Sequence, residues 1–513
     1  MNGIFTPLFN NFVKTLRRAQ SLPRISSGGE REKHYLSFGV VRAVTGATAL
    51  LLVAQAAHAT TLWQVWQLAK LHAPALEQAE ATLEQAHATH SAALAQLLPA
   101  LNLNASHIVD NQSSNGPQFY GSGIVPVSQA SNTRTNGWDL QLSQSLFDWH
   151  AIQNLSAADY SEAAGVASAE ATRQTLMATL TQDYLAVLNA QAQLGATREA
   201  QDGFATQAIQ AAARYKAGLS GIIGTDETQA ALAQAQAETL AAEQAFKQAR
   251  RQLDTDAGVH ISGPFPDLPA NLTLSLPAGV NRNAYVQRAL SQNPTLAAAR
   301  LSQTSAGHAL SATRAGYLPS VSLVLSHQRN FVIGSSDFSV PGSAVTSPAT
   351  QDASQNMIGL QLSWAIFSGG ATSAAAQAAE AQQRSADASA RTAELSIVSQ
   401  VSNALDGLVS AQKRVRQLQT GVTSAQAAVT ATAAAVSKGL NTEQNLVIAR
   451  QTLLTLETDY AQAVVDLVNN RVALEQSLGT LTPDLLSQLS SKIGRASADA
   501  LTDNSQPNGD SPQ

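Results

Sequence analysis

Two histidines, His87 and His90, are the first residues in the chain whose types and spacing could do chemistry. They stand three positions apart, and Glu84 stands three positions before His87, so a helix would place all three side chains on one face. Imidazole and carboxylate groups can bind zinc, but such a site needs a third convincing ligand, which this stretch does not supply. We therefore interpret the three side chains as a solvated helix face and predict no bound metal.

Other patterns that could support catalysis or cofactor binding are incomplete. The stretch GLSGIIGT at 218–225 has glycines but lacks the lysine of a phosphate-binding loop. No cysteine is present, which excludes disulfides, thiolate metal sites and a lipid-modified cysteine behind a leader. No Ser/His/Asp set or carboxylate pair stands out. These observations predict no enzyme activity and no cofactor.

The N-terminus has the pattern of an export signal. An apolar stretch over 43–54 follows a basic region and ends at Ala57-His58-Ala59, a small-x-small cleavage site. The stretch is shorter than the roughly 18 residues that a membrane-spanning helix needs. We predict a signal peptide over 1–59, cleaved between Ala59 and Thr60, rather than a membrane anchor. The basic region is unusually long, and the sequence leaves open a translation start further downstream.

Composition points to long helices packed through small side chains. Hydrophobic residues make up 44% of the chain, but aromatic residues only 5%. Residues 1–59 hold seven of the 31 basic and two of the 36 acidic residues, so their removal changes the net charge from −5 to −10. An acidic chain without a basic patch is a poor partner for nucleic acid. No later segment has 18 uncharged apolar residues, so any membrane insertion would require strands.

The rest of the chain is a duplication with an offset of about 220 residues. LPALNLNASH at 98–107 matches LPSVSLVLSH at 318–327, and LQLS occurs at 140 and again at 360. Further along, Gly258 after one helix matches Gly479 after another, now with an offset of 221. A spacing this constant over so long a stretch predicts two copies of one structural unit.

Each copy predicts the same order of elements. A helix is followed by a strand, a polar loop, a second strand, a very long helix, a tight turn and a shorter returning helix. The predicted spans are 61–97, 100–110, 111–136, 137–147, 149–216 and 220–258 in the first copy, and 283–317, 320–329, 330–354, 356–367, 370–437 and 441–478 in the second. We divide the chain into a first repeat at 60–276, which includes a short strand at 272–276, a second repeat at 277–490, and a disordered polar tail at 491–513.

Lengths and strand patterns indicate how the copies assemble. A 68-residue helix is about 100 Å long, and the two shorter helices of a copy together match it, which predicts antiparallel rods. Strands of 10–11 residues with alternating apolar and polar side chains have the length of tilted membrane-spanning strands. Four strands cannot close a barrel, and open edges are not tolerated in lipid. Three chains would supply twelve strands.

The chain resembles the TolC family of outer-membrane channel proteins, also called outer-membrane efflux or outer-membrane factor proteins. The likeness covers about residues 61–490. The phrases that carry it are Ala69, Pro74 and Ala79 in the first helix, Leu98-Pro99 and Leu318-Pro319 before strands, IFSGG at 366–370, and VALEQSLGTLTPDLLSQL at 472–489. Each phrase alone is weak, but their order and spacing together are specific.

The resemblance implies a mainly α fold with a transmembrane β part: a homotrimer with a twelve-stranded barrel in the outer membrane and an α-barrel of long antiparallel helices in the periplasm. It implies an exit duct of a tripartite efflux pump or a type I secretion system, fed by an inner-membrane transporter through a periplasmic adaptor protein. The family's adaptor contacts lie at the periplasmic turns. In this chain these turns contain Tyr215, Lys216, Gly218, Leu219, Lys438, Gly439 and Leu440.

The resemblance also implies a constriction just after the turns, at Asp226, Asn445 and Ile448. Relatives often have aspartates six and nine positions after the second turn glycine, where this chain has Asn445 and Ile448. A trimer would then have a neutral polar ring in place of an acidic one. The rival hypothesis is a soluble periplasmic coiled-coil adaptor or scaffold protein. An adaptor would need one helical hairpin where this chain has two. The exported substrate leaves no trace in the sequence.

Overall fold

The computed structural model describes residues 59–120, 123–268 and 281–503. All of them belong to one unit, Ala57–Gln513. The predicted signal peptide, apart from Ala59, lies outside the described residues, and so does the predicted short strand at 272–276. Within the described ranges, no helix combines the length and apolar character needed to cross a membrane.

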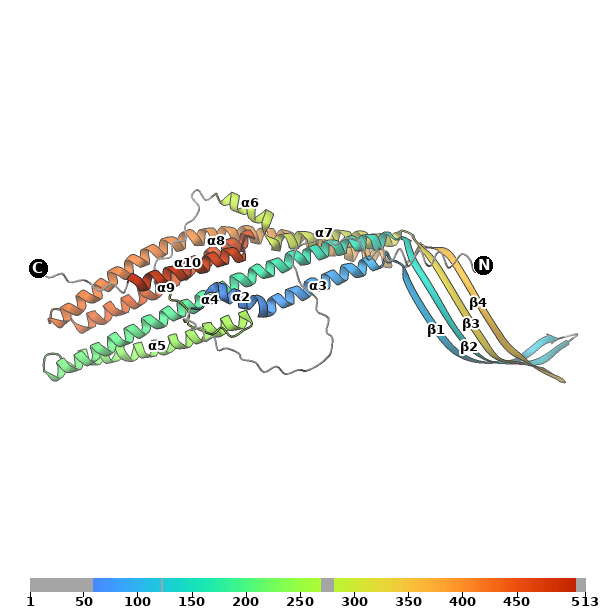
Figure 1. Ribbon diagram of the computed structural model, residues 1–513, viewed down its shortest axis with the longest axis horizontal. Coiled ribbons are helices and arrows are strands. Elements are labelled where there is room, and N and C mark those ends of the chain that lie inside the picture. The colour runs from blue at the N-terminus through green and yellow to red at the C-terminus, as the bar shows by residue number, and fades with distance from the viewer. Residues whose placement is uncertain (1–58, 121–122, 269–280, 504–513) are drawn as a thin grey trace, which may run out of the picture. The chain divides into compact units, whose positions relative to one another are not determined.

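Two very long helices carry the fold. Helix α4 runs from Trp149 to Lys216 and follows strand β2, and helix α8 runs from Ala371 to Ser437 and follows strand β4 (Figure 1). Each returns through a shorter antiparallel helix, α5 (Ile222–Ala257) after α4 and α9 (Glu443–Leu478) after α8. All four helices begin and end within two residues of the predicted spans. Alanine-rich sequence and the absence of internal proline explain their length.

The first helix of each repeat is broken, whereas the sequence analysis predicted it to be continuous. Helices α2 (Leu62–His72) and α3 (Pro74–Ala95) replace the predicted 61–97, and α6 (Arg282–Gln292) and α7 (Pro294–Arg314) replace 283–317. A proline has no N–H and forces the residue before it out of the helical region. Ala73 and Asn293 accordingly have ψ angles of 120° and 122°. The prediction of one continuous helix was wrong because it did not treat Pro74 and Pro294 as helix breaks.

The returning helix of each repeat ends against its break. Gly258 and Gly479 end α5 and α9 in the left-handed region, with φ of 72° and 75°. A Cβ atom on Gly258 would lie 2.1 Å from the carbonyl oxygen of His72, and one on Gly479 would lie 2.5 Å from that of Gln292. Only glycine allows both this conformation and this approach. In the second repeat, Asn293 Nδ2 also donates to the carbonyl oxygen of Ser477 at 2.9 Å.

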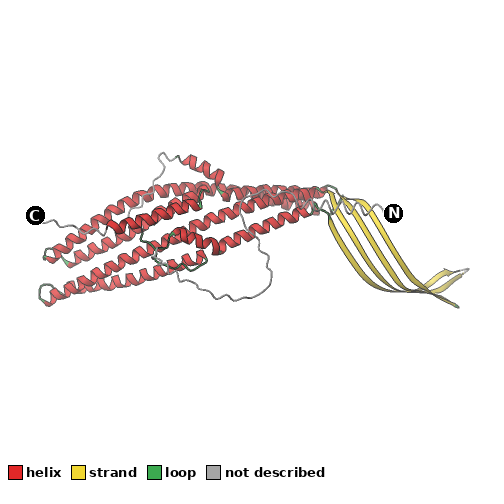
Figure 2. Cartoon of the chain, in the orientation of Figure 1, coloured by secondary structure: helices red, strands yellow, loops and turns green. Residues whose placement is uncertain are grey.

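The four strands, yellow in Figure 2, form one antiparallel sheet, and their order is β1-β2-β3-β4 (Figure 1). They span β1 Ala100–Tyr120, β2 Gly123–Phe147, β3 Ser320–Val340 and β4 Ser343–Ser363. The loops predicted at 111–136 and 330–354 are therefore largely strand, and β4 ends at Ser363, before the predicted 367. Backbone pairing continues between polar residues such as Asn111 and Asn132. Alternating apolar residues show only which part of a strand has an apolar face. The backbone pairing between neighbouring strands extends beyond that part.

The register separates the two faces of the sheet. Leu103 lies opposite Leu140, Leu142 opposite Leu325, and Leu323 opposite Leu360, so the apolar residues of all four strands share one face. Polar partners such as Asn102 and Gln141 occupy the other. Exposed leucines, including Leu103 (68%) and Leu360 (71%), cover the apolar face. This is the pattern of a sheet with lipid on one side and water on the other.

The largest core cluster lies around the two helix breaks. It contains Trp66 of α2 and Leu188 of α4, together with parts of α8, α9 and the C-terminal helix α10 (Pro483–Asp503). The predicted disordered tail at 491–513 is wrong up to Asp503, because α10 continues to that residue; 504–513 lie outside the described residues. Helix α10 packs on α2, where the N–H of Trp63 donates to Ser490 Oγ at 3.1 Å.

Candidate functional site

The two turns that reverse the long helices have the same construction. Gly218 and Gly439 have φ of 71° and 72°, and the amide N–H of the next residue reaches back to the helix. Leu219 N–H donates to the carbonyl oxygen of Arg214, and Leu440 N–H to that of Ala435, both at 2.9 Å. This closure satisfies the last carbonyl groups of each helix and needs a left-handed residue.

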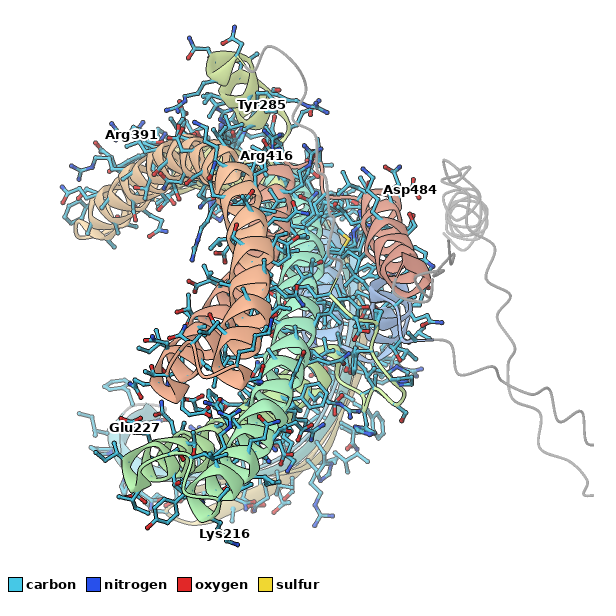
Figure 3. The ribbon with its side chains drawn as sticks, turned by 90° about the vertical axis from the view of Figure 1, so that its left-hand side faces the viewer. Lys216, Glu227, Tyr285, Arg391, Arg416 and Asp484 are labelled. Atoms are coloured by element: carbon cyan, nitrogen blue, oxygen red, sulfur yellow. The ribbon has the colours of Figure 1, made fainter. Side chains whose placement is uncertain are left out.

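All seven predicted contact residues are exposed at these turns. The leucines after the glycines, Leu219 and Leu440, are each 78% exposed, and Tyr215 is 45% exposed. Lys216 extends from the end of α4 in Figure 3. A large apolar side chain that the fold leaves in water at the same position of both repeats is a feature of a protein contact surface.

The three predicted constriction residues lie just beyond the turns. Asp226 is an exposed residue of α5, and Asn445 and Ile448 are exposed residues of α9. Thr442 caps α9 by accepting the N–H of Asn445 at 3.3 Å. Asn445 Nδ2 donates to Asn441 Oδ1 at 2.6 Å, so the side-chain oxygen of Asn445 takes no part in that hydrogen bond. The site is uncharged at Asn445, as the sequence indicated.

A polar link between the two helical hairpins was not predicted. Glu443, the first residue of α9, forms an ion pair with Arg214 of α4. Gln207 Nε2 donates to both the carboxylate and the carbonyl oxygen of Glu443, at 3.1 Å each. Arg214 and Glu443 stand 229 positions apart in sequence, so no local pattern could have paired them. The link ties α4 to α9 within two turns of the ends of both hairpins.

Buried charge continues along the same helix pair. Burial lowers the pKa of Arg450 of α9, against the opposing effect of Glu199 of α4, and it raises the pKa of Glu457, with Glu199 adding to the rise. The guanidinium occupies the space beside Gly203, where a Cβ atom would collide with it. A glycine in the middle of α4 therefore makes room for a charge on α9.

Comparison with known proteins now adds to this geometry. The family model described as outer membrane efflux protein matches residues 65–259 and 285–480, one match for each repeat. The chain belongs to the outer membrane efflux protein family. It is a TolC-type channel of the outer membrane and not an enzyme. The predicted family and the mainly helical fold with two repeats and four antiparallel strands are confirmed.

Individual relatives cover most of the chain. It is 27% identical over 450 residues to outer membrane protein TolC of Escherichia coli strain K12, covering 85% of this chain and 86% of TolC. It is 24% identical over 350 residues to alkaline protease secretion protein AprF of Pseudomonas aeruginosa, covering 67% and 69%. The solved outer-membrane channel OprN matches with a TM-score of 0.67 at 22% identity, covering 82% and 90%, which supports the fold.

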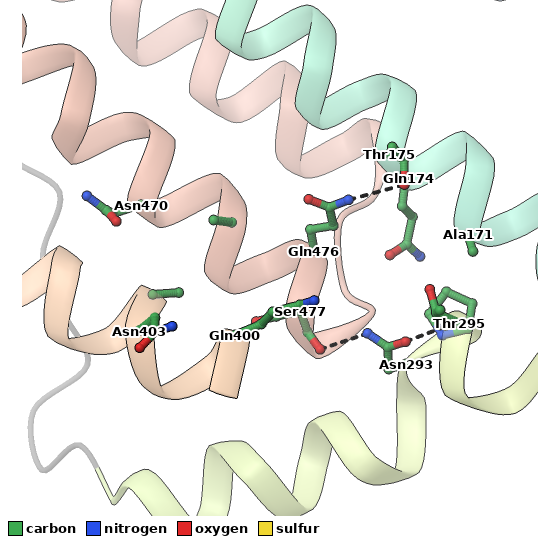
Figure 4. Close-up of a pocket in the computed structure, with 13 residues that line it drawn as sticks. Ala171, Gln174, Thr175, Asn293, Thr295, Gln400, Asn403, Asn470, Gln476 and Ser477 are labelled. Carbon is green, nitrogen blue, oxygen red and sulfur yellow. Dashed lines mark hydrogen bonds between the residues drawn. The ribbon is translucent and has the colours of Figure 1, made fainter. Parts of the chain in front are cut away.

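In this efflux-family chain, a cavity of about 440 Å³ lies where the second break meets α4, α8 and α9 (Figure 4). Its polar lining is made of amides and hydroxyls. Asn293 donates to the carbonyl oxygen of Ser477, and Gln476 Nε2 donates to Thr175 Oγ1 at 3.2 Å. Gln174, 4% exposed, finds no donor for its Oε1 among the described residues. No charged side chain is among the residues that line it.

Two histidines at matching positions of the repeats, His107 and His327, and Trp364 have structural partners. His107 Nδ1 lies 2.6 Å from Asn136 Oδ1, and the equivalent His327 Nδ1 lies 2.6 Å from Asn356 Oδ1. Trp364 follows β4 and donates from Nε1 to the carbonyl oxygen of Tyr317 at 3.0 Å. Over the described ranges, no group of three or more histidines and carboxylates could hold a metal ion.

The N-terminal residue of the predicted mature chain is tied into the helical part of this channel. Thr60 is buried; its N–H donates to the carbonyl oxygen of Pro264 at 2.8 Å, and its own carbonyl oxygen accepts from the hydroxyl of Tyr184 at 2.9 Å. Burial raises the pKa of Tyr184.

Asp183, the residue before Tyr184 in α4, faces Asp256 of α5. Burial, together with this second carboxyl, raises the pKa of Asp183 to about 7.

Replacing Asp183 by asparagine should flatten the pH dependence of stability. A carboxyl whose folded pKa is raised contributes stability that is present below its unfolded pKa and is lost as pH rises through about 7. We expect Asp183→Asn to melt a few degrees above the wild type at pH 8.5 and at about the same temperature at pH 5. Thermal unfolding of the purified protein measures this. Asp226→Asn, an exposed carboxyl, is the control; a wild-type slope in Asp183→Asn would contradict the prediction.

Removing the charge of Glu443 should loosen the ends of the two hairpins. The side chains of Arg214 and Glu443 are only 28% and 14% exposed, so Glu443→Gln should cost roughly 1.5–3 kcal/mol of interaction between α4 and α9. We expect a higher mean conductance in planar bilayers, because the hairpins can then move apart. Glu227→Gln, on α5 and without an ion pair among the described residues, should conduct as the wild type does. Identical conductance of both variants would show that the link does not restrict the channel.

Proposed function

We propose that three copies of this chain form the outer-membrane exit duct of a tripartite efflux pump or a type I secretion system. The observation that carries this proposal is the four-stranded sheet, whose outer strands β1 and β4 have no partner on one side within the part of the chain that the structure describes. A strand edge exposed to lipid leaves backbone N–H and C=O groups without hydrogen bonds. Three sheets joined edge to edge would pair every edge in a twelve-stranded barrel, continuous with the long helices.

The duct would conduct passively. An inner-membrane transporter would supply the cargo, and a periplasmic adaptor protein would join the transporter to the duct at the helical turns. Exposure of Leu219 and Leu440, at matching positions of the two repeats, supports a contact with the adaptor there. With three chains, six such turns would surround the periplasmic mouth.

Two kinds of export system fit the relatives. The family is one of efflux proteins, whereas the relative AprF is named for secretion of an alkaline protease. Both need the same duct, so the pump and not the duct would select the cargo. The rival adaptor hypothesis is disfavoured because the family model covers both repeats.

The proposal also assigns roles to individual residues of the constriction and of the N-terminus. Asp226, Asn445 and Ile448 would narrow the duct just above the periplasmic turns, with three Asn445 amides forming a neutral ring. Cleavage between Ala59 and Thr60 would leave Thr60 at the N-terminus, held by its bonds to Pro264 and Tyr184. The repeats would then divide at 276, as 60–276 and 277–490.

Fractionation and crosslinking test the duct. We expect the full-length gene product, expressed in a bacterium that lacks its own duct, to appear in the outer membrane as a crosslinked trimer and to restore export. Purified protein should also conduct ions in a planar bilayer. Recovery of the mature protein in the soluble periplasm, or as a monomer in the membrane, would rule out the proposed duct.

Replacing Asn445 by aspartate should make the duct more selective for cations. The substitution would add three negative charges to the ring, and fixed charge in a narrow pore attracts counter-ions. The shift in reversal potential under a potassium chloride gradient measures selectivity. Gln444→Glu, which adds the same charge on a neighbouring face of α9, is the matched control. If both variants keep the wild-type reversal potential, Asn445 does not line the constriction.

A further inference from the structure

Two histidines of α3 meet two carboxylates of α4. His87 Nδ1 lies 2.6 Å from Glu162 Oε1; His90 Nε2 lies 2.8 Å from Asp159 Oδ1, and His90 Nδ1 lies 3.2 Å from Glu162 Oε2. The histidines are three positions apart on one helix, and the carboxylates are three positions apart on the other. Glu162 thus bridges both histidines, while His90 bridges both carboxylates.

The contacts of His90 require a specific protonation state. A neutral imidazole has one N–H and one nitrogen lone pair, so it can donate to only one carboxylate. Its second nitrogen would then face a carboxylate oxygen, lone pair to lone pair. Only the imidazolium form donates to Asp159 and Glu162 at the same time. The full set of contacts therefore exists only when His90 is protonated.

The charged side chains near this cluster are mostly acidic. Helix α3 has no lysine or arginine, and its other charged residues are Glu77, Glu80 and Glu84. On α4, Arg173 is already engaged by Glu170, with two hydrogen bonds of 2.8 Å. The next helix packed on α4 contributes His308 of α7, which stacks on Tyr160 with the ring centroids 5.2 Å apart. In the described structure, no Lys or Arg side chain makes an ion pair with Asp159 or Glu162.

The equivalent helices of the second repeat are joined differently. Between α7 and α8, Arg300 lies 3.3 Å from Glu394 and Arg314 lies 3.7 Å from Glu380. A guanidinium keeps its charge at any physiological pH, whereas a histidine changes charge between about pH 5 and 8. The same helix pairing is thus held by fixed charges in one repeat and by protonatable groups in the other.

We propose that His87, His90, Asp159 and Glu162 form a proton-dependent clamp that fastens α3 to α4 in acidic surroundings. Gly165 lets the helices approach at this point, since a Cβ atom there would lie 3.3 Å from the Cβ of Ala86. Helix α3 leads from α2 into β1, so the clamp fixes the segment between α2 and the sheet. A neutral His90 could donate to only one of its two carboxylate partners, so half of its contacts would be lost.

Hydrogen exchange of the intact protein in detergent micelles tests the clamp locally. Protection of backbone amides in 83–95 is compared at pH 5.5 and pH 8, after correction for the intrinsic exchange rate at each pH. Ion pairs that are partly exposed change local opening by about two- to fivefold, so we expect that much extra protection at pH 5.5. The stretch of α7 around Arg300, 294–303, contains no histidine and should show no such change. The local readout separates the clamp from the titration of Asp183.

Two variants and a chelator make the outcome decisive. Glu162→Gln should lose the extra protection at pH 5.5, and the double variant His87→Gln/His90→Gln should do the same if Glu162→Gln fails to assemble. Arg314→Gln, the matched control in the second repeat, should leave the pH ratio of 83–95 unchanged. A wild-type ratio in both clamp variants would overturn the proposal. Loss of the pH ratio on adding EDTA would also overturn it, since a metal and not a proton would then hold the helices.

Discussion

The requirement that every backbone N–H and C=O in lipid has a partner determines the rest of the molecule. Among the described residues, the sheet satisfies it across three strand pairs and leaves it unmet along the outer edges of β1 and β4. In the proposed trimer, the edges of three such sheets would pair with one another, so assembly would complete the fold. Because each hairpin continues into a long helix, closing the sheets would also bring the helices of neighbouring chains together.

Small side chains allow the long helices to pack at this density. Gly203 makes room for the guanidinium of Arg450, and Gly407 makes room for the amide of Asn470, where a Cβ atom would lie 2.3 Å from Oδ1. The glycines at the breaks let each returning helix end directly on a carbonyl group. Buried large apolar residues gather around these breaks, as Trp66 does, whereas towards the turns the described buried cluster is small and includes Phe204 and Val447. The chain therefore needs few aromatic residues: they fill the tightly packed region around the breaks, and few are needed near the turns, where the hairpin ends can separate.

The sequence predicted most of the architecture because duplication and helical periodicity are local, repeated signals. It located α4 to the residue and both turn glycines correctly. It failed where local signals were weak or misleading. Polar stretches such as Asn111–Asn115 pair as strand because their partners are already aligned. Pro74 interrupts the predicted helix and is the first residue of α3. The Arg214–Glu443 pair and the carboxyls of Asp183 and Asp256 could not be predicted, since each depends on helices that meet only in the folded chain.

Duplication fixes the backbone of the two repeats but leaves their polar contacts free to differ. Asn293 caps α7 and bonds to the end of α9, whereas its counterpart Ala73 has no side chain to do either. Arginines join α7 to α8, and histidines join α3 to α4. One repeat can thus keep a constant geometry while the other responds to its surroundings, without any change in the sheet that both share. A duct that works passively can be regulated only through such contacts between its helices, because it has no chemical step to control.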